Sequence, residues 1–136
     1  LPLLYFPLMG EGQPYRRFDD VWMGVLAKKV ADHLHWPVAA GTPWVCHTRA
    51  SDPYANLVAE APGVELNERL WRYVHAIELS GDDPADCMRQ IGHSFRAHKD
   101  PYLVQYGEAL DVWVDLTQAI LERDPGVLAD LCPSGS

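Results

Sequence analysis

The chain has 136 residues, of which 48% are hydrophobic and 22% charged, and 19 acidic against 11 basic residues give a formal net charge of −8. This length and composition suit one compact domain with a real core. The acidic balance and the lack of a basic run disfavour non-specific binding to nucleic acid or to anionic lipid. No stretch reaches the roughly 18 apolar residues of a membrane span, so no integral membrane segment is expected.

The cysteines and the first residues indicate the setting of the chain. Cys46, Cys87 and Cys132 are scattered and odd in number, which favours reduced thiols in a cytosolic protein over a disulfide framework or a structural zinc site. The chain opens on the apolar run Leu1–Phe6 without an initiator Met. We interpret this opening as the sign of a C-terminal fragment of a longer protein.

The first half predicts a mixture of strands and one helix. A buried strand is expected over Leu3–Met9, and a Gly- and Pro-rich turn follows it. Apolar residues then recur at helical spacing from Asp19-Asp20 to Leu34. Two short strands are expected over Val38–Ala40 and Trp44–Thr48.

From Pro53 onward the pattern is helical only. The predicted helices cover Tyr54–Glu60, ended by Pro62-Gly63, then Leu66–Ile77, Pro84–Ala97 and Leu103–Ile120. They are expected to pack around four large side chains, Leu70, Trp71, Leu110 and Trp113. The apolar stripe of the last helix needs a partner surface, and Asp111 and Asp115 on its polar side are interpreted as a solvated face.

One group of residues that could carry chemistry surrounds the start of the first helix. Asp19 and Asp20 are adjacent carboxylates directly after a Gly-rich turn, with Arg17 before them and Trp22 after them. Such a pair can bind a cation or a sugar hydroxyl, and one member can act as a base. The structural alternative is that Asp19 only caps the helix, since Asp is a favoured N-cap residue.

A second group follows at the end of the third predicted strand. His47 can supply a nitrogen ligand to a metal, and Arg49 and Ser51 can contact a diphosphate. The alternative is that His47 is a packing residue in an apolar strand. The local pattern alone leaves both readings open.

Taken in order, several segments resemble the reversibly glycosylated polypeptides, also called UDP-arabinopyranose mutases. The resemblance covers nearly the whole chain and is densest between Tyr5 and Leu57. The segments that carry it are Leu4-Tyr5-Phe6, Met9–Pro14, Arg17–Gly24, Lys29, Asp32-His33-Leu34, Gly41-Thr42-Pro43, His47, Ala50-Ser51, Pro53, Asn56-Leu57 and Asp100-Pro101-Tyr102, with the helix that contains Trp113.

The resemblance implies an α/β fold of the GT-A glycosyltransferase type, which binds a UDP-sugar together with a divalent cation, usually Mn²⁺. Residues 1–52 would then be the C-terminal part of the catalytic core, and residues 53–136 a mostly helical region packed on it. By position, Asp19-Asp20 match the acidic pair that faces the sugar, and His47 matches the late metal-contacting His. The Asp-rich metal motif, the uridine-binding strands and the self-glycosylated Arg of the family lie upstream of this chain.

If the resemblance holds, the reaction is the interconversion of UDP-arabinopyranose and UDP-arabinofuranose. Asp20 is assigned as the sugar-facing carboxylate, with Asp19 orienting it, and His47 as a metal ligand. Substrate contacts are assigned to Arg17, Trp22, Arg49 and Ser51. The piece alone is expected to be inactive, because it lacks the uridine site and most metal ligands.

Two other functions remain open at this stage. A true glycosyltransferase would use Asp20 to deprotonate an acceptor hydroxyl of a protein or glycan. A non-catalytic module would use the Leu103–Ile120 stripe for assembly, and these helices are also where a homo- or hetero-oligomer would form. The expected location is the cytoplasm, with peripheral attachment to the Golgi in a eukaryote.

Overall fold

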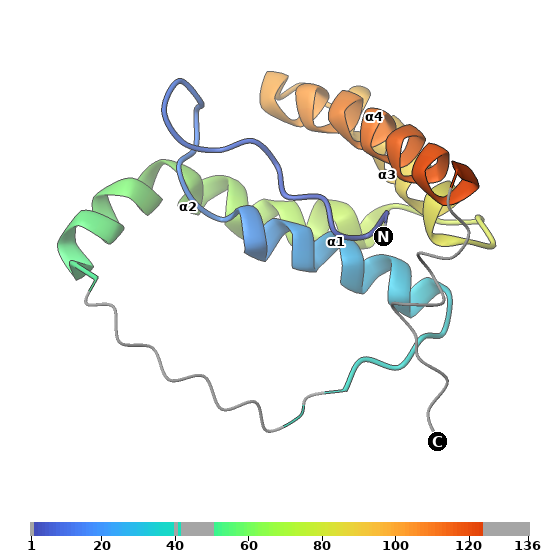
Figure 1. The fold of residues 1–136 in the computed structure, drawn as a ribbon. Helices are drawn as coiled ribbons and strands as arrows, with labels where there is room; N and C mark the ends of the chain where they lie inside the picture. The colour runs from blue at the N-terminus through green and yellow to red at the C-terminus, as the bar shows by residue number, and fades with distance from the viewer. Residues whose placement is uncertain (1, 40, 42–50, 124–136) are drawn as a thin grey trace.

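The computed structural model describes residues 2–39, 41 and 51–123. It contains four helices, α1 (Asp19–His33), α2 (Pro53–Ala76), α3 (Pro84–Arg96) and α4 (Pro101–Arg123). Figure 1 shows α1 beside α2, with the hairpin of α3 and α4 above them and the N-terminal segment running between the two layers. The described part of the chain contains no strand.

Three of the helices begin with the same dipeptide. Asp52, Asp83 and Asp100 each precede a proline, and each accepts a hydrogen bond from a backbone N–H in the first helical turn, at 2.7–2.9 Å. Aspartate satisfies an N–H that has no intrahelical partner, and proline fits the first helical position because it has no N–H to leave unpaired. These three starts therefore follow directly from the sequence.

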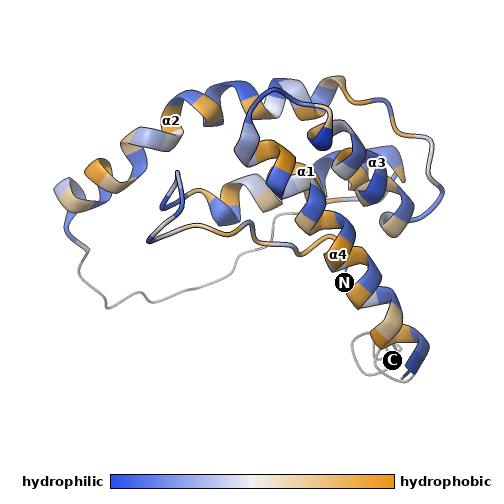
Figure 2. Cartoon of the chain, turned by 90° about the horizontal axis from the view of Figure 1, so that it is seen from above, coloured by the Kyte–Doolittle hydropathy of each residue, from blue (hydrophilic) through white to orange (hydrophobic). Residues whose placement is uncertain are grey.

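The core lies between the two layers, where each helix contributes a stripe of buried side chains. Colouring by hydropathy shows apolar and polar residues alternating along each helix (Figure 2). The largest fully buried side chains come from all four helices: Trp22, Leu26, Val30, Leu70, Val74, Met88, Ile91, Phe95, Leu103, Leu110 and Val114. The stripe of α4 is thus mainly covered by this chain's own core, which weakens its use as an assembly surface.

The hairpin of α3 and α4 depends on two glycines. A Cβ at Gly107 would lie 2.5 Å from the carbonyl oxygen of Gly92, and one at Gly92 would lie 3.1 Å from that of Gly107. Only residues without a side chain allow the two backbones to approach this closely. A larger residue at Gly107 would therefore force the helices apart.

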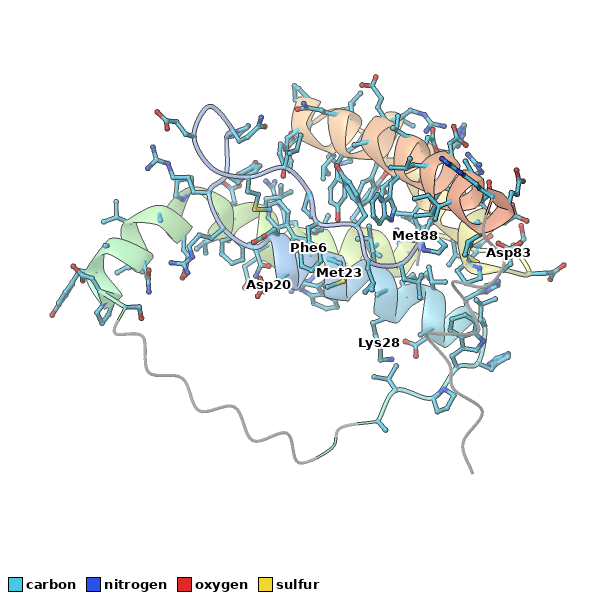
Figure 3. The ribbon with its side chains drawn as sticks, in the orientation of Figure 1. Phe6, Asp20, Met23, Lys28, Asp83 and Met88 are labelled. Carbon is cyan, nitrogen blue, oxygen red and sulfur yellow. The ribbon has the colours of Figure 1, made fainter. Side chains whose placement is uncertain are left out.

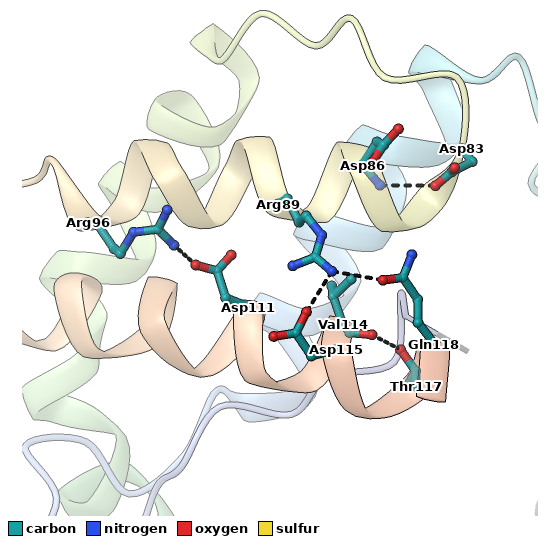
Figure 4. Close-up of polar contacts among 9 residues, drawn as sticks. All are labelled: Asp83, Asp86, Arg89, Arg96, Asp111, Val114, Asp115, Thr117 and Gln118. Carbon is teal, nitrogen blue, oxygen red and sulfur yellow. Dashed lines mark hydrogen bonds and ion pairs between the residues drawn. The ribbon is translucent and has the colours of Figure 1, made fainter. Parts of the chain in front are cut away.

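Two ion pairs bridge the same hairpin on its solvent side (Figure 4). Arg96 pairs with Asp111, and the Nη2 of Arg89 lies 2.6 Å from the Oδ1 of Asp115 and donates to Gln118 Oε1 at 2.8 Å. Asp115 is exposed and Asp111 partly exposed, as expected of a solvated face, but both carboxylates also form ion pairs that the sequence did not predict. The two carboxylates are one turn apart on α4 and meet arginines that lie two turns apart on α3.

The buried strand predicted over Leu3–Met9 is not present, and only Pro7 in this range is buried. Alternate residues face the helices: Tyr5 packs on Tyr106 and Trp113, whereas Leu4 and Phe6 are about half exposed. The hydroxyl of Tyr102 donates to the carbonyl oxygen of Leu8 at 2.9 Å. The segment lies on helices, so among the described residues it has no neighbouring strand to pair with.

The second difference concerns α2, which is one helix where two were predicted. Pro62 lies inside Pro53–Ala76 and does not end the helix. Figure 1 shows the part of α2 before Pro62 projecting beyond the other helices. Trp71, predicted to be in the core, is 49% exposed, whereas Leu70 and Leu110 are buried as predicted. Helices α1, α3 and α4 confirm the predicted helices to within a few residues.

The α/β expectation is confirmed only in its coarser form, a mostly helical chain. Residues 38 and 39 are not in a strand, and Trp44–Thr48 lies outside the described residues. The GT-A fold and the division at residues 52 and 53 stay predictions. Within the described part of the chain, no helix combines the length and the apolar character needed to cross a membrane.

Candidate functional site

The acidic pair lies at the start of α1, on an open pocket of about 410 Å³ that we call the acidic pocket. Asp19 is partly exposed and Asp20 is exposed. Figure 3 shows the Asp20 side chain at the start of α1. The pocket is lined by Arg17, Phe18, Asp19, Asp20, Val21 and Glu60. Its carboxylates therefore face solvent and are accessible to a ligand.

The expectation that Asp19 caps the helix is wrong. The N-cap residue is Phe18, which has a φ of 90° and makes no side-chain cap hydrogen bond. Asp19 is the first helical residue, and Asp20 Oδ1 accepts a hydrogen bond from the N–H of Val21, at 2.8 Å, and from no other group in the described part of the chain. Both carboxylates lie in the first turn of α1, near the positive end of the helix dipole.

The backbone at Phe18 is strained, and neighbouring side chains hold it in place. A positive φ is unusual for a bulky residue other than glycine. The Phe18 ring stacks on Trp22 with centroids 5.8 Å apart and planes at 10°, and it occupies the space above Gly63, where a Cβ would lie 2.7 Å from the ring. The turn before the acidic pair therefore depends on the missing side chain of Gly63.

Trp22 lies beneath the site, not in it. Its exposed fraction is 0%, and its Nε1 donates to Asn67 Oδ1 at 3.0 Å. A fully buried indole offers no surface to a ligand in this structure, so the arrangement does not support the direct substrate contact assigned to Trp22. Its contacts are those of a residue that supports Phe18 and the first turn of α1.

Arg17 connects the loop before α1 to the exposed half of α2. Its Nη1 donates to Asn56 Oδ1, and its Nε lies 3.6 Å from Glu60 Oε1. The side chain of Arg17 is 45% exposed, so the ion pair contributes little stability. Its effect is to place a cation and a third carboxylate at the edge of the acidic pocket.

Sequence reasoning missed Asn56, Glu60, Gly63 and Asn67 as parts of this site. They are spaced four, three and four residues apart, which puts them on one face of a continuous helix. This spacing was a usable signal. It was lost because Pro62-Gly63 was interpreted as the end of a helix.

Of the second predicted group, His47, Arg49 and Ser51, only Ser51 lies within the described residues. His47 and Arg49 lie outside the described residues, so their convergence with Asp20 stays a prediction. Ser51 is exposed and directly precedes the N-cap residue of α2, Asp52. Within the described ranges, no three His, Cys, Asp or Glu residues gather closely enough to hold a metal ion. A divalent cation prefers about six oxygen ligands, so Asp19 and Asp20 could supply only part of such a site.

Tyrosines close to the acidic pair are kept neutral by their surroundings. Burial raises the pKa of Tyr102, and the neighbouring Tyr5 and Tyr15 and the negative charge of Asp19 raise it further. Burial likewise raises the pKa of Tyr15, whose ring packs edge-on against Trp22 and Tyr102. These hydroxyls therefore stay protonated well above neutral pH.

Comparison with known proteins places the chain in a family. The model of the family described as "Reversibly glycosylated polypeptide" matches residues 1–121. The "Probable UDP-arabinopyranose mutase 4" of Arabidopsis thaliana is 38% identical over 119 residues, which is 84% of this chain and 33% of that protein. The "UDP-arabinopyranose mutase 1" of Oryza sativa subsp. japonica is 34% identical over the same shares.

The chain therefore belongs to the reversibly glycosylated polypeptide family. The "UDP-arabinopyranose mutase 3" of Arabidopsis thaliana is 31% identical, again over 84% of this chain and 33% of that protein. The chain thus spans about a third of the length of the curated relatives that it matches. No solved structure matches it significantly.

Proposed function

We propose that this chain forms part of the catalytic region of a UDP-sugar mutase that interconverts UDP-arabinopyranose and UDP-arabinofuranose in the cytoplasm. The observation that carries the proposal is the acidic pocket, where two adjacent carboxylates stand free of any capping role at the start of α1. The names of the relatives supply the substrate class.

In this mechanism the bond between the sugar and the diphosphate loosens, and the ring closes again through a different hydroxyl. Positive charge builds up on the sugar ring as the bond loosens, and a carboxylate beside the ring stabilises it. Asp20 is the more exposed member of the pair and takes this role, with Asp19 and Arg17 beside it in the lining of the same pocket. A divalent cation, Mn²⁺ in our proposal, would stabilise the negative charge on the departing UDP when bound.

The remaining predicted residues would serve the diphosphate end. We propose His47 as a metal ligand and Arg49 and Ser51 as diphosphate contacts, and this assignment rests on the family resemblance. Asp19 and Asp20 would complete the coordination or face the sugar. Further metal ligands and the uridine contacts would come from the part of the family's length that this chain does not span.

The test uses a chimera of the rice relative, in which the segment that aligns with this chain is replaced by it. We expect the chimera to interconvert the two UDP-arabinose forms, measured by chromatography of the nucleotide-sugars. Asp20→Asn should lower the rate by about 100-fold or more, in the range of a lost catalytic carboxylate. Glu68→Gln, at an exposed carboxylate elsewhere on α2, is the matched control and should keep the rate. A folded chimera that binds UDP and keeps its rate with Asp20→Asn contradicts the proposal.

A glycosyltransferase is the second candidate, and the exposure of Asp20 is what favours it. An open pocket would let an acceptor hydroxyl approach the carboxylate, which could then remove its proton. The same chimera separates the two reactions. A mutase yields the second UDP-arabinose form from UDP-arabinose alone, whereas a transferase releases UDP only when an acceptor is added.

A further inference from the structure

A second hollow begins where the acidic pocket ends. It lies between α1 and α2, has a volume of about 390 Å³, and is called the α1–α2 groove here. Val21 lines both the groove and the acidic pocket, so the two are neighbours along α1. Its walls include Gly24 and Lys28 on α1 and Trp71 and His75 on α2. Figure 3 shows Asp20 near the start of α1 and Lys28 further along the same helix.

Among the described residues, no close contact requires a glycine at position 24. Glycine is among the least favourable residues inside a helix, because it loses the most backbone entropy. At Gly63 and Gly107 a Cβ would meet other atoms at 2.7 Å and 2.5 Å, whereas at Gly24 nothing among the described residues lies within 4 Å. Because Gly24 has no side chain, the groove is open at this position.

Trp71 forms the opposite wall and is unusually accessible for its size. Its exposed fraction is 49%, and the guanidinium of Arg72 lies 5.1 Å from the centre of its ring. The exposed indole of Trp71, opposite the open helix surface at Gly24, forms a flat apolar wall. Ligand sites typically combine such a wall with a few polar groups.

The two lysines of the groove are already paired, which disfavours a charged occupant. Lys28 forms an ion pair with Asp32, and Lys29 Nζ donates to the carbonyl oxygen of His75 at 2.9 Å. A phosphate would have to compete with Asp32 for Lys28. A neutral molecule with several hydroxyls can instead accept from the ammonium groups and donate to the carboxylate without breaking the pair.

The spacing along α1 fits a molecule of the size of one sugar. A helix rises 1.5 Å per residue, so Gly24 lies about 6 Å beyond Asp20 along the axis. That is about the width of one sugar ring. A ring over Gly24 and against Trp71 would therefore adjoin whatever the acidic pocket holds.

We propose that the α1–α2 groove binds a neutral sugar ring between Gly24 and Trp71, next to the acidic pocket. The identification of that sugar as a pentose rests on the proposed function. The proposal that the groove binds a neutral sugar ring does not. The ring is held by apolar contact with the indole and by hydrogen bonds to Lys28, Asp32 and Lys29.

The experiment records amide and indole N–H spectra of the 136-residue chain during titration with L-arabinose, and separately with UDP. We expect L-arabinose to shift the Trp71 indole and the Gly24 amide, and UDP to leave both unchanged. Gly24→Ala and Gly24→Leu form a size series, because both residues favour the helix and should raise the melting temperature. Arabinose affinity should nevertheless fall with side-chain size, by about 10-fold or more for Leu.

Each other outcome overturns the proposal. Equal shifts with UDP would assign the groove to a nucleotide, and shifts that depend on protein concentration would make this face a contact between copies of the chain. Saturating arabinose that shifts neither residue, or affinity unchanged in Gly24→Leu, would leave no sugar site. Failure of the proposed function gives a different result. The chimera is then inactive, but the Gly24 and Trp71 signals still respond to arabinose, so the sugar site remains while the mutase reaction is excluded.

Discussion

The start of α1 differs from the starts of α2, α3 and α4 in how its carboxylates are used. Asp52, Asp83 and Asp100 each have a carboxylate oxygen that accepts hydrogen bonds from the first turn. Asp19 and Asp20 stand inside the first turn of α1, after a residue at positive φ that makes no side-chain cap. At the starts of α2, α3 and α4, the aspartate carboxylate thus stabilises the helix as a cap. At the start of α1, two carboxylates line a pocket instead.

The largest expected effect comes from filling the space under Phe18. Gly63→Leu should lower the free energy of unfolding by about 2 kcal/mol, because the new side chain overlaps the Phe18 ring and overpacking typically costs 1–3 kcal/mol. Urea denaturation measures the change. The control is the same substitution at the open mid-helix glycine, Gly24→Leu, which should stabilise the chain by roughly 0.5 kcal/mol. Equal effects at both positions would show that Gly63 does not hold the turn before the acidic pair.

A smaller effect separates the two kinds of helix start directly. Asp83→Ala removes the acceptor of two backbone N–H groups, from Ala85 at 2.7 Å and Asp86 at 3.0 Å, and should cost about 1 kcal/mol. Asp20→Ala removes a single short-range hydrogen bond and part of a dipole interaction, and should cost about 0.5 kcal/mol or less. Thermal denaturation of the two variants compares them. If Asp20→Ala is as destabilising as Asp83→Ala, then Asp20 has a structural role and the contrast between the starts fails.

The sequence predicted the parts of the fold that local chemistry determines. The apolar spacing located α3 and α4, and the acidic residues after the Gly-rich turn located α1. It failed at α2, because a proline inside a helix is locally unfavourable, by about 3 kcal/mol. Contacts from elsewhere in the chain favour the continuous helix: Arg17 reaches Asn56 and Glu60, Phe18 covers Gly63, and Trp22 donates to Asn67.

The same reasoning explains what was found of the candidate site. Asp19, Asp20 and Arg17 are neighbours in sequence, and they line one pocket as predicted. Glu60 was not predicted, because its place in the pocket depends on how α2 packs against the loop before α1. Trp22 was assigned to the substrate from its position beside the acidic pair, but its helical spacing with Leu26 and Val30 already indicated the core.

The smallest expected effect links the start of α1 to that of α4 through the charge of Asp19. Burial, followed by the charges of Tyr5, Tyr15 and Asp19, raises the pKa of Tyr102, and burial also raises that of Tyr106. A folded-state pKa above the unfolded value of about 10 leaves stability intact below pH 10. Above it, the unfolded chain releases protons that the folded chain retains, so stability falls by up to about 1.4 kcal/mol per pH unit for each group.

Urea denaturation between pH 8 and pH 11 should therefore show stability falling above pH 10. Tyr102→Phe should make the fall shallower, although it also removes the hydrogen bond to Leu8 and lowers stability at pH 8. Asp19→Asn should lower the tyrosinate titration midpoint of Tyr102 slightly, because a smaller negative potential opposes ionisation less. The ring ¹³C chemical shift of Tyr102 follows this midpoint separately from the other five tyrosines. Asp32→Asn, at an exposed position near the far end of α1, is the control and should leave that midpoint unchanged. An unchanged midpoint with Asp19→Asn would mean that solvent screens the Asp19 charge from Tyr102 at the start of α4. The carboxylates of Asp19 and Asp20 would then have no electrostatic effect on α4.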